Sequence, residues 1–250
     1  MKQSMLTDGF YLYGIFPPPG PQGLKVKGLD DQVVETHTVE GFVFLYSIAQ
    51  QDRYLASRKN LLGHAKVLEE AMQAGFRTHL PLPLNRLIFQ TWEEVVEQLI
   101  LPHRHTLKQL FEILDGKREV SLKIYWDEVA ELEGLMATNE SLRQQRDRLE
   151  GRQLTMDEII RIGQQIESAL REHQSTIIQW VQSHLNPLSV QIVENDLQTE
   201  SMIYNAAYLI DWERESEFSQ QVDALDRSFE NRLRLRYNNF TAPYNFARLP

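Results

Sequence analysis

The order of strand and helix patterns after Glu119 restricts the fold more than any other feature of the sequence. Apolar and polar residues alternate from Glu119 to Trp126, which predicts a strand buried on one face. The patterns that follow are a long helical region at about 127–186, strands at 190–194 and 202–210, a helix from about 216 to 229 and a strand at 232–237. This is the order of a ferredoxin-like domain, in which an antiparallel sheet carries helices on one face.

The long helical region is predicted to be a hairpin. Gly151 interrupts it, and Thr155 to Glu158 form a capping-box sequence that begins a second helix. Apolar residues at helical spacing then continue from Ile159 to Val181. Two helices joined by a short break predict an antiparallel helical hairpin at about 127–186, which can project from the domain.

The first 116 residues predict the same plan with its first helix replaced by a loop. Phe10 to Phe16 is an aromatic strand pattern, and the prolines at 17–21 exclude a regular element directly after it. Two further strand patterns, 33–39 and 42–48, are separated by Glu40 and Gly41, which predicts a hairpin.

The remainder of this first part predicts helices and an edge strand. A helical pattern at about 57–75 is followed by an extended segment at 80–89, whose prolines restrict it to a sheet edge or an irregular conformation. Another helix begins with a capping box at Thr91, is interrupted by Pro102 and ends at Gly116.

We therefore predict an α+β chain of two domains, each a modified ferredoxin-like antiparallel sheet with helices. The boundaries are 1–116 for the N-terminal domain, 117–237 for the C-terminal domain with its helical hairpin, and 238–250 for an extended aromatic C-terminal tail.

The last stretch of the chain combines an arginine-bearing strand with this aromatic tail. Arginines at every second position from 232 to 236 predict an outer face, and the strand pattern ends at Asn238 and Asn239, which favour a turn. The tail either covers the core of the protein itself or binds a partner. The candidate partner-binding residues are Arg232, Arg234, Arg236, Tyr237, Phe240, Tyr244 and Phe246.

Composition narrows the function classes. The formal net charge of −9 argues against general binding to nucleic-acid phosphates, which requires clustered basic residues. The absence of cysteine excludes disulfides, thiolate metal sites and thiol nucleophiles, and is compatible with a reducing compartment. No apolar run approaches the roughly 20 residues of a membrane helix, so we expect no lipid-membrane partner.

The sequence predicts no catalytic, cofactor-binding or metal site. The sequence contains no glycine-rich dinucleotide or phosphate loop and no nucleophile elbow. His103 and His105 are the close histidine pair, and they are interpreted as surface residues rather than metal ligands. The arginines at 232–236 could bind a phosphate, but pairing with acidic residues across the sheet is favoured.

Several sequence stretches, in this order and spacing, resemble the gas vesicle accessory proteins of the F/L family (GvpF/GvpL), with cyanobacterial members the most similar. The resemblance covers nearly the whole chain. The stretches that carry it are Tyr11–Ile15, Gly41–Tyr46, Leu80–Leu82, Val120–Trp126, Asn205–Ile210, Phe218–Tyr237 and Pro243–Phe246.

The resemblance implies a non-enzymatic protein of the gas vesicle, located in the cytoplasm. Such a protein would be a minor component or an assembly factor that binds the small hydrophobic shell protein GvpA, and other accessory proteins in addition, and limits GvpA aggregation during nucleation. An alternative function is a small hydrolase or nucleotide-binding enzyme with a site in the cleft between the domains. A pocket lined by convergent charged groups with shifted pKa values would favour that alternative.

Overall fold

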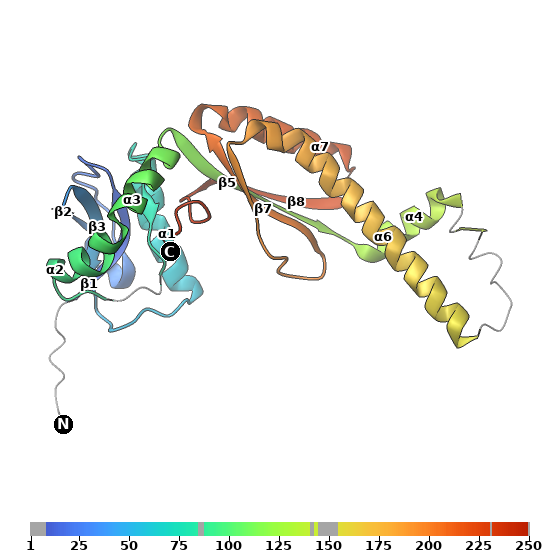
Figure 1. Ribbon diagram of the computed structural model, residues 1–250, viewed down its shortest axis with the longest axis horizontal. Coiled ribbons are helices and arrows are strands. Elements are labelled where there is room, and N and C mark those ends of the chain that lie inside the picture. The colour runs from blue at the N-terminus through green and yellow to red at the C-terminus, as the bar shows by residue number, and fades with distance from the viewer. Residues whose placement is uncertain (1–8, 85–87, 141–142, 145–154, 231, 250) are drawn as a thin grey trace, which may run out of the picture. The chain divides into compact units, whose positions relative to one another are not determined.

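A computed structural model describes residues 9–84, 88–140, 143–144, 155–230 and 232–249 (Figure 1). It contains two four-stranded antiparallel sheets, with the strand orders β2-β3-β1-β4 and β6-β7-β5-β8. In both sheets the second strand lies at one edge, the third and first strands are central and the fourth lies at the other edge, as in a ferredoxin-like domain. The predicted α+β fold class is confirmed.

The chain divides into two compact units. Unit 1 comprises Met1–Val120, Leu209–Trp212 and Asn239–Pro250, and unit 2 comprises Ser121–Tyr208 and Glu213–Asn238. Residues 239–250, which the sequence predicts as part of a separate tail, belong to unit 1.

The first sheet and its helices form most of unit 1. The elements are β1 (Phe10–Phe16), η1 (Leu29–Asp31), β2 (Glu35–Val39), β3 (Phe42–Ile48), α1 (Arg58–Gln73), β4 (Leu80–Pro81), α2 (Trp92–Val95), η2 (Val96–Ile100) and α3 (Leu101–Leu114). As predicted, the proline-containing strand β4 lies at a sheet edge. The helix that begins after Thr91 is interrupted by the π-helical turn η2, and Pro102 lies in the first turn of α3.

Helices pack on both faces of this first sheet. Tyr11 and Tyr13 of β1 point to the face covered by α1, and the Tyr11 hydroxyl bonds to His64 Nδ1 of α1 at 2.7 Å. On the opposite face Trp92 of α2 stacks on Phe10 with 4.9 Å between ring centroids. The central strands are therefore buried on both sides, as their nearly continuous apolar sequence requires.

The second sheet and its helices supply unit 2. The elements are β5 (Lys117–Trp126), α4 (Glu128–Thr138), α6 (Met156–Leu185), η3 (Asn186–Leu188), β6 (Gln191–Glu194), β7 (Met202–Asp211), η4 (Trp212–Arg214), α7 (Glu215–Ser228) and β8 (Leu233–Thr241). The two helices of the predicted hairpin are α4 and α6, but most of the segment that joins them lies outside the described residues, so the hairpin stays a prediction.

Helices α6 and α7 lie along one face of the second sheet (Figure 1). Phe218 of α7 packs against Tyr208 of β7, and Gln182 of α6 donates a 2.7 Å hydrogen bond to Glu194 of β6. The opposite face carries Tyr125, beneath the guanidinium groups of Arg234 and Arg236. The alternation in β5 and β8 therefore separates a helix-covered face from a basic face, as the sequence predicts.

The prediction that the last strand ends at Tyr237 is wrong. Strand β8 continues through Asn238 and Asn239 to Thr241, because pairing next to β5 overrides the turn preference of the two asparagines. Aromatic Phe240, assigned to the tail, is consequently a strand residue.

We predict that Gly28→Ala destabilises unit 1 by about 2–3 kcal/mol, as overpacking of a core does. A Cβ atom at this position would lie 1.8 Å from the Tyr13 hydroxyl oxygen. That oxygen accepts a hydrogen bond from the Leu29 amide at 2.8 Å and bonds to the Ser47 hydroxyl at 2.9 Å. Urea unfolding monitored by tryptophan fluorescence measures the loss.

Gly163→Ala is the matched control for this substitution. Gly163 lies inside α6 with no atom within 4 Å of the added methyl group, so alanine should stabilise by about 0.5–1 kcal/mol through helix propensity. Equal unfolding midpoints for Gly28→Ala and the unchanged protein would contradict the close packing around Tyr13.

Candidate functional site

Arg232, the first of the three predicted arginines, is paired with a buried carboxylate. Its Nη1 atom donates to Glu131 Oε2 at 3.2 Å, and His173 Nε2 lies 2.8 Å from the same oxygen. The Glu131 side chain is only 2% exposed, whereas that of Arg232 is 52% exposed. Arg232 therefore compensates an acidic residue of helix α4, whereas the sequence predicts pairing with acids across the sheet.

Arg234 and Arg236 project from the basic face of the second sheet. Both side chains are exposed, and their guanidinium carbons lie 4.7 and 5.2 Å from the centroid of the Tyr125 ring. Stacking on an aromatic ring holds a guanidinium in place and leaves its N–H donors available to a partner. These two residues are exposed cationic groups of the predicted partner surface.

The aromatic candidates face inwards. Tyr237 stacks on Phe218 with 5.9 Å between ring centroids, and Phe240 and Tyr244 pack partly buried against the core of unit 1. Phe246 is 7% exposed. The structure thus brings Arg234 and Arg236 to the surface of β8, places Arg232 directly before this strand and turns the aromatic residues inwards.

A buried carboxylate holds the end of the chain in unit 1. Glu119 accepts hydrogen bonds from the Asn245 amide at 2.8 Å and from Asn245 Nδ2 at 2.7 Å. Burial raises the pKa of Glu119 to about 7, although the two hydrogen bonds and Arg248 favour the ionised form. Residues 242–247 can therefore dock as an ordered segment rather than fray.

Sequence patterns did not identify Glu119, Glu131 or Tyr125 as important. Glu119 and Tyr125 fall on the polar side of the β5 alternation, where an exposed position is the normal expectation. Glu131 lies in a helix rich in acids and does not stand out among them. The residues that compensate its burial, His173 and Arg232, are distant in the sequence. No local signal distinguishes these residues from ordinary surface residues.

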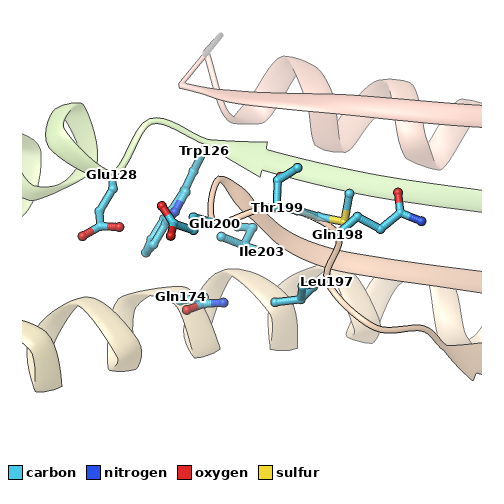
Figure 2. A pocket seen from close by; sticks show the side chains of 9 residues that line it. Trp126, Glu128, Gln174, Leu197, Gln198, Thr199, Glu200 and Ile203 are labelled. Atoms are coloured by element: carbon cyan, nitrogen blue, oxygen red, sulfur yellow. The ribbon is translucent and has the colours of Figure 1, made fainter.

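A cavity of about 540 Å³ lies at the end of the second sheet, next to Trp126 (Figure 2). Trp126 is the last residue of β5, Glu128 begins α4, Gln174 belongs to α6, and Leu197 to Glu200 form the loop before β7. In Figure 2 the carboxylates of Glu128 and Glu200 lie beside the Trp126 indole, and Gln174 faces them from the helix. The sequence analysis did not predict this cavity, because its walls come from four separate segments.

The groups with shifted pKa values lie mostly in the interior and do not converge on a cavity. Burial lowers the pKa of His64 and of His79 to about 4, and raises the pKa of Tyr54 to about 12. Within the described ranges, no three histidine or acidic side chains are placed to hold a metal ion. Likewise, none of the described helices is both long and apolar enough to cross a bilayer.

We predict that Glu119→Gln changes how stability depends on pH. The pKa of this carboxyl is about 7 in the folded protein and 4.5 in the unfolded chain, so the folded state binds more protons between these values. The contribution of Glu119 to the free energy of unfolding should therefore decrease by about 3 kcal/mol as the pH rises from 4.5 to 7, and the variant should lack this decrease.

The measurement is the difference in unfolding free energy between Glu119→Gln and the unchanged protein at each pH. His64 and His79 have lowered pKa values, so their contribution to the unfolding free energy is lost as the pH falls from about 6.5 to 4. This gives both proteins a pH dependence of opposite sign to that of Glu119. Their effects cancel in the difference. For the exposed substitution Glu97→Gln, the difference in unfolding free energy should not change with pH. A difference that is also independent of pH for Glu119→Gln would contradict the raised pKa of Glu119.

Comparisons with known proteins assign the family of this chain. The family model described as gas vesicle synthesis protein GvpL/GvpF matches residues 9–248. Gas vesicle protein F of a Nostoc species is 53% identical over 98% of the chain and 100% of that protein. Gas vesicle protein F of Dolichospermum flosaquae is 54% identical over 96% of the chain and 97% of that protein.

Solved structures agree with this assignment. The crystal structure of GvpF from an Anabaena species has a TM-score of 0.90 at 53% identity and covers 97% of this chain and 99% of its own. That of GvpF from Microcystis aeruginosa has a TM-score of 0.83 at 52% identity, with coverages of 96% and 99%. The chain belongs to the GvpL/GvpF family of gas vesicle synthesis proteins.

Proposed function

We propose that this chain is a non-enzymatic gas vesicle accessory protein that binds the shell protein GvpA and limits its aggregation during vesicle nucleation. It would act in the cytoplasm, as a minor component of the vesicle or as an assembly factor. Membership of the family supports a role in the gas vesicle. The structural observation that best supports the binding role is the exposed arginine face of the edge strand β8.

An edge strand suits a chaperone-like contact with a self-associating protein. β8 ends the strand order of the second sheet, so an extended segment of another protein can add beside it through main-chain hydrogen bonds. Arg234 and Arg236 stand exposed on this strand and would engage side chains of that segment. Because arginines on an edge also oppose self-pairing, the same strand can recruit a partner and keep its own protein soluble.

The seven candidate residues divide into two roles in this proposal. Arg232, Arg234 and Arg236 contact GvpA, and the half-buried Tyr237 supports this strand from its other face by stacking on Phe218. Phe240, Tyr244 and Phe246 hold the end of the chain against unit 1, as their burial and the Glu119–Asn245 hydrogen bonds favour. The tail then acts on binding indirectly, through the position of β8.

Arg234→Glu with Arg236→Glu should weaken GvpA binding at least tenfold, a change of about 1.4 kcal/mol or more. Binding is measured by capture of purified GvpA on the immobilised full-length chain. Light scattering of GvpA alone should rise with time, and the unchanged chain should suppress this rise more strongly than the variant.

Arg53→Glu with Arg58→Glu is the charge-matched control. Both residues are exposed in unit 1, and the double substitution changes the net charge by the same amount. Equal capture by both double variants would reject the β8 surface. Absence of capture even by the unchanged chain would reject GvpA binding and would favour the alternative enzymatic function.

Hydrogen exchange tests the indirect role of the tail. We expect the amides of Asn245, Phe246 and Ala247, which are hydrogen-bonded within unit 1, to exchange at the same rate with and without GvpA. Selective protection or release of these amides on binding would instead assign the tail a direct contact with GvpA.

A further inference from the structure

We propose that the cavity beside Trp126 binds an arginine or lysine side chain presented by a protein partner. This site adjoins the β8 surface, since Trp126 and Glu128 also line a neighbouring hollow with Arg232 and Arg234, and its carboxylates carry the opposite charge. Its principal residues are Trp126, Glu128, Gln174, Leu197, Glu200 and Ile203.

The cavity has firm walls. Met202 and Ile203, at the start of β7, are 1% and 2% exposed and form part of its base. The loop before β7 is held by a 2.8 Å hydrogen bond from Asn205 Nδ2 to the Asp196 carbonyl and by a 3.0 Å bond from Lys123 Nζ to Gln198 Oε1. A site that is already formed loses little entropy when a ligand binds.

Two carboxylates at the mouth of the cavity favour a cation. Glu128 and Glu200 are both exposed and line the cavity, and neither forms an ion pair with a residue in the described part of the chain. Lys123 of β5, a nearby cation, is bonded to Gln198 instead. Leu197, 51% exposed, offers an apolar wall for the methylene stem of a long basic side chain.

The Trp126 indole can add a hydrogen bond to a ligand. Trp126 is 8% exposed, its indole N–H bonds to no other described residue, and its nitrogen is not one of the buried atoms without a partner, so solvent reaches it. In Figure 2 the indole ring lies beside Glu200, with Gln174 on the helix below. A peptide carbonyl next to the basic side chain would accept a hydrogen bond from this N–H in place of water.

A peptide segment fits these features better than a free polyamine. The carboxylates bind the cation, the indole N–H donates to the main-chain carbonyl, and the Gln174 amide can either donate or accept. A polyamine offers the charge but no acceptor for the indole. Because most of the net negative charge of the chain lies after Gly116, long-range attraction would also direct a basic segment to this unit.

The test uses the full-length chain and the peptide acetyl-Gly-Arg-Gly-amide. The indole N–H signals of the four tryptophans are followed by NMR, and Trp126→Phe assigns the signal of interest. We expect the Trp126 signal to shift on titration with the arginine peptide. The same peptide with citrulline, which has nearly the same shape but no charge, should bind at least tenfold more weakly.

Two double variants test the carboxylates. Glu128→Gln with Glu200→Gln should weaken arginine-peptide binding at least tenfold, whereas the exposed pair Glu97→Gln with Glu133→Gln should leave it unchanged. Three results would each overturn the proposal: equal binding of the citrulline peptide, undiminished binding by the first variant, or a shift with spermidine as large as that with the peptide. The citrulline comparison uses the unchanged protein and remains decisive if a variant fails to fold.

Discussion

The hydrogen bonds between Glu119 and Asn245 determine how the second half of the structure ends. A carboxylate that is 3% exposed must find donors, and both come from a residue 126 positions later. Ala242, Phe246 and Ala247, which flank Asn245, are buried as well. Strand β8 runs to Thr241, directly before this docked segment, so the polar contact orders the chain where the strand ends.

Edge strands present a problem to a protein whose proposed partner self-associates. The first sheet ends in β4, which has only two residues, and the second sheet has the four-residue β6 at one edge. Short edges offer little template for pairing with other chains. β8 is the long exception, with nine residues, and it carries Arg234 and Arg236 where an apolar side chain would invite aggregation. This combination of length and charge distinguishes β8 as a surface for selective pairing.

Local patterns were sufficient to predict the order of strands and helices along the chain, and this order is the one from which the ferredoxin-like strand order was expected. The alternation in β5 predicted its buried face, and the prolines at 81 and 83 predicted a sheet edge at β4. The end of β8 was wrong because Asn238 and Asn239 favour turns locally, and a neighbouring strand overrode that preference. Glu119, Glu131 and the walls of the Trp126 cavity could not be found in this way. Their roles depend on residues that are distant in the sequence and meet only in the folded chain.

The two proposed surfaces of unit 2 have opposite charge, and this has a consequence for assembly. Arg234 and Arg236 favour acidic or polar side chains beside β8, whereas Glu128 and Glu200 exclude acidic segments from the Trp126 cavity. A single partner segment placed at the wrong surface would bring like charges together, which weakens binding far more than loss of a surface contact. The two surfaces adjoin, because Trp126 and Glu128 also line a hollow with Arg232 and Arg234, and each discriminates by repulsion as much as by attraction. Two such surfaces would let an accessory protein hold segments of opposite charge beside a growing shell.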